Sequence, residues 1–231
     1  ETTQVREQGC GAALFGYTKL YGQVPGGQAE YLRVPHADYG PVKVPEGPPD
    51  DRFLYLSDVL PTAWQAVEYA AVAPGGSLAV LGLGPIGDMA CRIARQRGID
   101  RVIGVDLVDE RLARARVRGV DALDLRSFDS TDELVEAIRD RTSGRGPDAV
   151  IDAVGMEAHG SGAAKAAHAM TAVLPNALAA KLMRTAGVDR LAALNVALDA
   201  VRRGGTVSIV GVYGGMTDPL PMMTMFDKQI Q

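Results

Sequence analysis

A glycine-rich turn between a short apolar run and an amphipathic segment constrains this chain more than any other feature. The apolar run is residues 78–81, and the turn that follows, residues 82–87, reads Gly-Leu-Gly-Pro-Ile-Gly and fits the pattern G-x-G-x-x-G. Residues 86–97 then show helical spacing and end at Gly98. A strand, a glycine turn and a helix in this order begin a unit in which parallel strands alternate with helices.

The alternation continues along most of the chain. Strands are predicted at 101–106, 122–125, 148–153 and 206–210, and helices at 109–119, where Asp109 is the expected cap, and at 131–142. An alanine-rich stretch, residues 159–203, is longer than one crossover needs and must be broken at Pro175. The pattern predicts an α/β fold with a doubly wound parallel sheet, covered by helices on both faces.

Each position of the glycine turn suits a bound pyrophosphate. Gly82 permits the tight turn, Gly84 leaves room for the pyrophosphate, and Gly87 lets the helix pack close to the strand. Pro85 and Ile86 begin the helix, whose free N–H groups and partial positive charge attract phosphates. The turn is therefore predicted to bind a dinucleotide. S-adenosylmethionine is an alternative, because methyltransferases share a related fold, but the helix start and the fifth strand disfavour it.

An aspartate at the end of the second strand indicates which dinucleotide is bound. Asp106 lies about 20 residues beyond the glycine turn, where a carboxylate accepts hydrogen bonds from the adenosine ribose hydroxyls. Its charge would repel a 2′-phosphate, which favours NAD over NADP. Arg111 is a second candidate cofactor contact, and its guanidinium would partly offset that repulsion.

The first fifty residues differ in composition from the rest. Residues 1–50 are rich in Gly, Pro and Tyr, with short β-type runs at 30–34 and 42–44, each closed by proline. They predict part of a β-rich domain. Residues 51–76 form a connecting helical segment, and 77–231 the sheet domain, incomplete at its C-terminal end. The apolar positions that predict the connecting helix are Trp64, Val67, Tyr69 and Ala71.

Composition narrows the classes of partner and site. The chain has 231 residues and a net charge of −4, and no basic block is dense enough to indicate nucleic-acid binding. The arginine-rich run 111–118 is interpreted as a solvated helix face, and no apolar run is long enough to span a membrane. With only Cys10 and Cys91, a disulfide framework and a four-cysteine zinc site are excluded, which favours a reducing cytoplasm. Cys91 is expected to be buried in the first helix of the sheet domain.

Several blocks, in order from about Gly11 to Gln231, resemble one enzyme family. The chain is similar to zinc-dependent medium-chain alcohol dehydrogenases, in particular the glutathione-independent formaldehyde dehydrogenase type. That resemblance implies a Rossmann NAD-binding domain beside the remnant of a GroES-like catalytic domain. The blocks are Gly26–Pro35, Leu56–Thr62, Gly144–Asp148, Ile151–Glu157 and Gly211–Gly215.

The resemblance also implies site residues and cofactors. Asp58 matches a ligand of the catalytic zinc, although on the sequence alone it is an ordinary helix cap. Thr62 matches a threonine that contacts the cofactor near the nicotinamide, and is, with Asp58, a catalytic candidate. Val154 and Val212 match loop positions that reach the nicotinamide, with strand-end packing as the alternative. The expected cofactors are NAD and zinc, and the expected substrate is a small alcohol or aldehyde.

The chain lacks much of what that family uses for catalysis. The first zinc ligands, the proton relay, the structural zinc lobe and the sixth strand have no counterpart, so we expect a chain truncated at both ends and inactive alone. The parent protein is expected to be a cytoplasmic enzyme and a homo-oligomer, a dimer or tetramer. A zinc-free quinone or enoyl reductase, and a non-catalytic dinucleotide-binding module, are the alternative functions.

Overall fold

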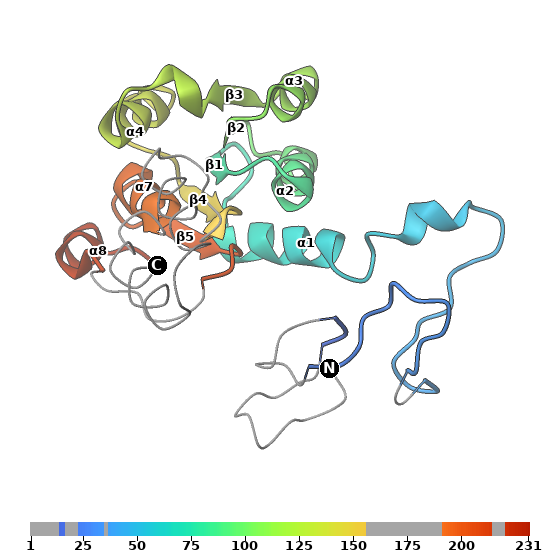
Figure 1. Ribbon diagram of the computed structural model, residues 1–231. Helices are drawn as coiled ribbons and strands as arrows, with labels where there is room; N and C mark the ends of the chain where they lie inside the picture. Colours follow the sequence, from blue (N-terminus) through green and yellow to red (C-terminus); the bar gives the residue numbers. More distant parts are fainter. Residues whose placement is uncertain (1–13, 17–22, 35–36, 156–190, 214–219) are drawn as a thin grey trace. The chain divides into compact units, whose positions relative to one another are not determined.

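The computed structural model divides into two compact units, Glu1–Phe53 and Leu54–Gln231, called unit 1 and unit 2 (Figure 1). The structure describes residues 14–16, 23–34, 37–155, 191–213 and 220–231. Within these described residues, no helix combines the length and apolar character needed to cross a membrane.

Unit 2 is built on a five-stranded parallel sheet with the order β3-β2-β1-β4-β5. The chain builds outward from β1 to β3 and then returns to the other side of β1, so the strand order reverses between β1 and β4. In such sheets ligands bind at this reversal, beyond the carboxyl ends of the strands. The strands are β1 (Ser77–Leu81), β2 (Arg101–Asp106), β3 (Asp121–Asp124), β4 (Ala149–Asp152) and β5 (Thr206–Ile209).

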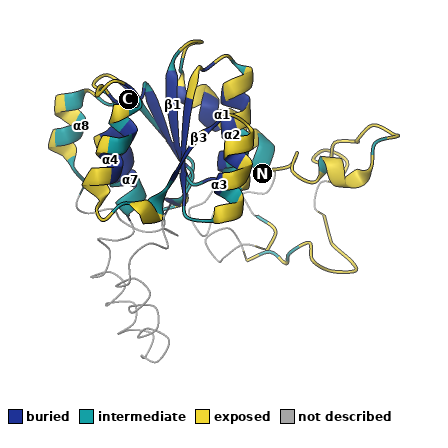
Figure 2. Cartoon of the chain, turned by 90° about the horizontal axis from the view of Figure 1, so that it is seen from above, coloured by how far each residue is buried: buried dark blue, intermediate teal, exposed yellow. Residues whose placement is uncertain are grey.

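Helices cover both faces of the sheet, which confirms the predicted α/β doubly wound fold. Viewed from above, α1, α2 and α3 lie on one side of the strands and α4, α7 and α8 on the other (Figure 2). A short 3₁₀ helix, η4 (Leu125–Ser127), follows β3. The helices are α1 (Val59–Ala70), α2 (Pro85–Gln96), α3 (Asp109–Val117), α4 (Thr131–Asp140), α7 (Ala192–Ala200) and α8 (Met222–Lys228).

The two central strands are buried over their whole length. Because successive side chains point to opposite faces, Leu78 and Val80 join the cluster under α1 and α2, whereas Ala79 and Leu81 join the cluster under α4 and α7. This two-sided burial explains why these strands are continuous apolar runs. The predicted elements from 77 to 153 and at 206–210 agree with the structure to within two residues.

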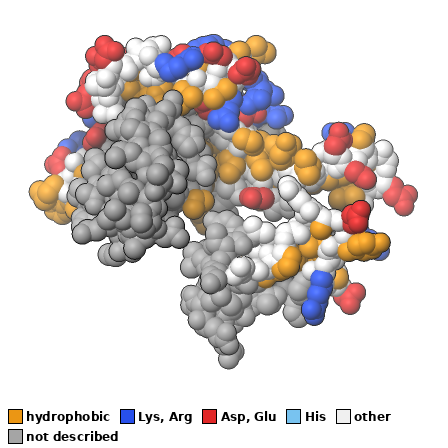
Figure 3. All heavy atoms as spheres, viewed as in Figure 1, with side chains coloured by type: hydrophobic (Ala, Val, Ile, Leu, Met, Phe, Trp, Pro, Cys, Tyr) orange, Lys and Arg blue, Asp and Glu red, His pale blue; other side chains and the backbone are white. Residues whose placement is uncertain are grey.

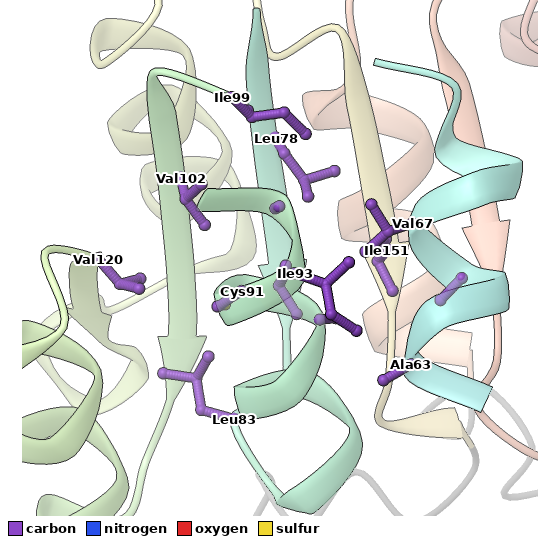
Figure 4. Close-up of a cluster of buried hydrophobic side chains, with 14 of the residues drawn as sticks. Ala63, Val67, Leu78, Leu83, Cys91, Ile93, Ile99, Val102, Val120 and Ile151 are labelled. Carbon is purple, nitrogen blue, oxygen red and sulfur yellow. The ribbon is translucent and has the colours of Figure 1, made fainter. Parts of the chain in front are cut away.

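The predicted connecting helix is shorter than expected and buries a different face. α1 begins at Val59 and buries Ala63, Ala66, Val67 and Ala70, of which Ala63 and Val67 are labelled in Figure 4. Trp64 and Tyr69 are exposed. Small alanines let α1 approach the sheet and α2 closely, where an indole or phenol ring would not fit. The Trp64 ring instead packs under the guanidinium of Arg97, 4.4 Å from its centroid.

The expected cap of α3 is also different. Val108 is the N-cap residue and Asp109 is the first helical residue, because the backbone N–H groups of Leu107 and Val108 bond to the Asp106 carboxylate and so set where the helix begins. Of the alanine-rich stretch 159–203, the structure describes only the part from Leu191, which includes α7. Pro175 lies outside the described residues.

Unit 1 differs from the sequence prediction in its strands. Residues 30–34 and 42–44 are not strands, and in the described part of unit 1 the β-type pairing is a single bridge between Phe15 and Val24. A β-type run forms a strand only when a neighbouring segment takes its backbone hydrogen bonds, and neither run has such a described neighbour. A 3₁₀ helix, η3 (Asp50–Phe53), ends the unit. The division at 50/51 and 76/77, with a partial GroES-like domain, stays a prediction.

Candidate functional site

The glycine turn follows β1 directly and lies at the reversal of strand order. Gly82 has φ +84°, a conformation that a residue with a side chain rarely adopts, and its N–H donates to the Val105 carbonyl at 2.8 Å. A Cβ at Gly82 would lie 2.9 Å from Val154 Cγ2. A Cβ at Gly87 would overlap the carbonyl oxygen of Gly82. Both glycines are therefore required by packing within the protein itself.

Gly84 is different, because the space beside it is open. It is the N-cap residue of α2, with φ −63°, and among the described residues a Cβ there would meet only Arg111 Nη1, at 3.9 Å. Pro85 is the first helical residue and has no N–H, while the N–H groups of Ile86 and Gly87 precede the first helical hydrogen bond and have no side-chain cap. An open backbone with free N–H groups at a helix N-terminus suits a phosphate.

Asp106 lies at the carboxyl end of β2 and is almost fully buried, with 7% of its surface exposed. Its Oδ2 accepts a hydrogen bond from the Leu83 N–H at 2.7 Å, within the glycine turn. Its Oδ1 accepts from the N–H groups of Leu107 at 2.7 Å and Val108 at 2.9 Å. Arg111 Nη1 is the most distant partner, 3.4 Å from Oδ2. The carboxylate thus ties the glycine turn to the start of α3.

Arg111 lies between the two parts of this candidate site. The same Nη1 atom that faces Asp106 would lie 3.9 Å from a Cβ at Gly84, and the Arg111 side chain is 43% exposed. A guanidinium in this place can move toward solvent or toward an incoming anion without disturbing the core. The structure therefore brings together the predicted residues of the glycine turn, Asp106 and Arg111.

Asp58 and Thr62 lie together at the N-terminus of α1. Asp58 is the N-cap residue, but its side chain accepts no hydrogen bond from the backbone of the first turn; Oδ1 instead accepts from Thr62 Oγ1 at 2.8 Å. Figure 4 shows that Ala63, the next residue of α1, lies at the same end of the strands as Leu83 in the glycine turn. The two predicted catalytic residues therefore lie at the carboxyl edge of the sheet.

The described residues do not form a metal centre. Within them, no group of three or more His, Cys, Asp or Glu side chains comes close enough to hold an ion. A catalytic zinc needs at least three protein ligands, and Asp58 supplies one carboxylate. Asp58 is exposed, and its second carboxylate oxygen has no hydrogen bond to the described residues.

The loops after β4 and β5 carry the predicted cofactor contacts Val154 and Val212. Val154 is half-buried against Gly82, and Val212 is 65% exposed. Asp152, which the sequence analysis did not single out, is fully buried beneath both loops and accepts a hydrogen bond from the Tyr213 hydroxyl. An aspartate at the end of an otherwise apolar strand was the available signal, since a buried carboxylate must have partners. The burial of the Tyr213 hydroxyl, with its bond to Asp152, raises its pKa.

The arginine-rich run lies on an exposed face of α3 and is mostly paired with acidic groups. Figure 3 shows basic side chains gathered where Figure 1 places α3. Arg118 and Arg114 both pair with Asp88, Arg111 pairs with Asp106, and Arg116 donates to the Ala122 carbonyl. This pairing agrees with the interpretation of a solvated helix face.

Comparisons with known proteins identify the family. Residues 85–174 match the family described as Zinc-binding dehydrogenase. The uncharacterized zinc-type alcohol dehydrogenase-like protein AdhB of Bacillus subtilis is 36% identical over 230 residues, which cover 98% of this chain and 56% of that protein. The glutathione-independent formaldehyde dehydrogenase of Pseudomonas aeruginosa is 34% identical over 84% of this chain and 50% of its own.

A solved structure of an alcohol dehydrogenase also matches this chain. Alcohol dehydrogenase TADH from Thermus sp. ATN1 superposes with a TM-score of 0.71 and 30% identity, covering 95% of this chain and 54% of its own. The chain spans about half the length of the curated relatives it matches. The parallel sheet, the glycine turn and these matches agree with the resemblance found in the sequence. The chain belongs to the zinc-type alcohol dehydrogenase family.

Proposed function

We propose that this chain is the NAD(H)-binding part of an oxidoreductase that interconverts alcohols and aldehydes. The observation that carries the proposal is the buried Asp106 carboxylate, which is hydrogen-bonded to Leu83 of the glycine turn and paired with Arg111, whose Nη1 lies beside Gly84. A carboxylate in this place accepts a hydrogen bond from the adenosine ribose of NAD and disfavours the 2′-phosphate of NADP.

Different residues of the chain are proposed to bind the pyrophosphate and the adenosine ribose of the cofactor. The N–H groups of Ile86 and Gly87 receive the pyrophosphate at the N-terminus of α2. The Asp106 carboxylate has four acceptor positions, and all four are occupied. The contact with the Arg111 guanidinium is the longest of the four, so a ribose hydroxyl takes its place. Arg111 then turns toward the phosphates, whose charge it partly neutralises.

The reactive half of the cofactor is proposed to lie over the ends of β4 and β5. A dinucleotide crosses the crevice at the reversal of strand order, so its second half extends away from Asp106 toward Val154 and Val212. Thr62, at the N-terminus of α1, would orient this half through its hydroxyl. When bound, NAD supplies the acceptor for the hydride removed from the alcohol.

Zinc is proposed only for the complete protein. The described residues supply Asp58 alone, so they do not fit a zinc centre. In this chain Asp58 accepts the Thr62 proton and so fixes the direction of that hydroxyl. An Asp58→Ala change is expected to leave NADH binding within a few-fold and to weaken binding of the catalytic zinc by the complete protein, as measured by its zinc content.

Some of the finer parts of the proposal rest on relatives. Formaldehyde is the proposed substrate class because curated relatives are named formaldehyde dehydrogenases. A cytoplasmic location and a homo-oligomeric state, a dimer or tetramer, are proposed from the sequence and not from the names of the relatives. A zinc-free quinone or enoyl reductase that uses NADPH is the second candidate, and Asp106 disfavours it.

Calorimetric titration with NADH and NADPH tests the proposed function. The protein is expected to bind NADH at least tenfold more tightly than NADPH, and Asp106→Ser is expected to reduce or reverse that preference. Arg111→Ala serves as the comparison, because it removes the cation but keeps the carboxylate, and should retain the preference for NADH. Equal binding of both cofactors, or binding of neither, would refute the proposal.

A further inference from the structure

Asp152 is a buried acid to which the proposed function gives no role. It ends β4, its surface is 0% exposed, and its Oδ1 accepts hydrogen bonds from the N–H groups of Val154 at 3.0 Å and Gly155 at 3.2 Å. Its Oδ2 accepts from the Tyr213 hydroxyl, from the loop after β5. A buried carboxylate is costly unless it is fully hydrogen-bonded, so this one has a specific structural role.

The two loops that Asp152 joins are in direct backbone contact. We call residues 153–155 and 210–213 the loop wall. The Asp152 carbonyl accepts from the N–H groups of Val210 at 3.0 Å and Gly211 at 2.8 Å. Gly155 has φ +68°, a Cβ there would lie 2.5 Å from the Val212 nitrogen, and a Cβ at Gly211 would overlap Gly155. The loops therefore move together or not at all.

The loop wall continues to the glycine turn on one side. Val154 Cγ2 is the atom nearest to a Cβ at Gly82, and the Ala153 N–H donates to the Leu81 carbonyl at 2.9 Å. Asp106 marks the adenosine side of the crevice at the end of β2, so the loop wall, at the ends of β4 and β5, lies on the opposite side. It is in the right place to contact the nicotinamide half only.

We infer that Asp152 and Tyr213 are a positioning pair that fixes the loop wall for the nicotinamide half of the cofactor. This inference rests on the proposed function. The carboxylate orients the loop after β4 through two N–H groups, and the Tyr213 hydroxyl fixes the loop after β5 to the same anchor. Without that hydroxyl, Oδ2 of Asp152 loses the hydrogen bond that it accepts within the described residues. The two loops then shift until another donor reaches this buried oxygen.

Titration with NADH and with ADP-ribose, which lacks the nicotinamide, separates positioning from general stability. Tyr213→Phe in the purified protein is expected to weaken NADH binding roughly tenfold, the scale of one hydrogen bond to a charged group, and to leave ADP-ribose binding within about twofold. Asp152→Asn keeps one acceptor oxygen for the two N–H groups, and its Nδ2 can only donate to the Tyr213 hydroxyl, so that contact is reversed in direction and loses the carboxylate charge. It should give a smaller loss with the same selectivity for NADH, and it keeps the inference testable if Tyr213→Phe folds poorly.

Two control variants match these changes. Tyr69→Phe removes a hydroxyl from an exposed tyrosine of α1, and Asp148→Asn changes the acid just before β4, at its other end. Both should leave the ratio of NADH to ADP-ribose affinity unchanged. If Tyr213→Phe weakened the binding of NADH and of ADP-ribose equally, or weakened neither, the inference would be overturned while the proposed function stands. An unmodified protein that binds neither ligand would overturn both.

Discussion

At the scale of single residues, two glycines of one turn have opposite constraints. Gly84→Ala places a methyl group in open space at φ −63°, so the free energy of unfolding should change by less than about 0.5 kcal/mol. NADH binding should weaken by more than about tenfold, because the methyl group occupies the place of the pyrophosphate. Gly87→Ala should instead lower the free energy of unfolding by more than about 3 kcal/mol, because its Cβ meets backbone.

Urea unfolding and NADH titration of the two variants check this prediction. The wild-type protein is the reference for both measurements. If Gly84→Ala were the less stable variant, or bound NADH as tightly as the wild type, the assignment of open space beside Gly84 to the pyrophosphate would be wrong.

The Cys91 thiol is expected to be unreactive toward thiol reagents in the folded protein. The thiol is 2% exposed, as expected from the sequence; burial, reinforced by the charge of Asp88, raises its pKa to about 12. At pH 8 roughly one thiol in ten thousand is then ionised. In a Cys10→Ser background, a disulfide reagent should react with Cys91 only at the rate of unfolding. Rapid stoichiometric labelling without denaturant would contradict this burial.

At the scale of elements, one acid joins the amino ends of β1 and β4. Asp148 accepts hydrogen bonds from Ser77 N–H and Oγ, both at 2.8 Å, from Arg202 at 2.7 Å and from Arg145 at 3.0 Å. Burial alone would raise the pKa of Asp148, but the hydrogen bonds from Arg202, Ser77 and Arg145 outweigh it and hold the pKa well below its ordinary value.

The lowered pKa makes this contribution depend on pH. A carboxyl whose pKa is lower in the folded state stabilises the fold above its unfolded pKa, near 4, and loses that effect as the pH falls toward the folded value. Asp148→Asn should therefore cost about 1–2 kcal/mol at pH 7, and less at pH 3. Urea unfolding at both pH values measures this. The exposed Asp140→Asn is the control, and a cost for Asp148→Asn that does not change with pH would disprove the assignment.

The sequence predicted most of the sheet but not the contacts between distant elements. The apolar runs of β1 and β4 and the pattern at Gly82, Gly84 and Gly87 are local signals, so they indicated strand, turn and helix directly. The Asp152–Tyr213 contact spans 61 residues and exists because β4 and β5 are neighbours, an order that local patterns do not determine. The buried face of α1 likewise depends on the space beside it, which admits alanine and excludes Trp64.

At the scale of the whole molecule, unit 2 contains all the described strands of the sheet and the hydrophobic clusters on both of its faces. Residues 54–231 expressed alone are therefore expected to unfold cooperatively, and NADH at about 100 times its dissociation constant should add about 2.7 kcal/mol to the free energy of unfolding. Thermal melts with and without NADH, beside the full chain, measure this. A gradual melt without cooperativity would show that unit 1 is needed for folding.

One half-buried acid, Asp148, lies just before β4 and one buried acid, Asp152, ends it, and their separate structural roles have a consequence for protein engineering. The hydrogen bonds of Asp148 join strands, whereas those of Asp152 shape loops beside the proposed ligand. The two carboxylates lie at opposite edges of the sheet, because Asp148 precedes the rigid strand Ala149–Asp152 and Asp152 ends it. A designer can therefore raise thermal tolerance at the amino edge and alter cofactor or substrate choice at the carboxyl edge in independent rounds of mutation. The two sets of gains should then combine additively.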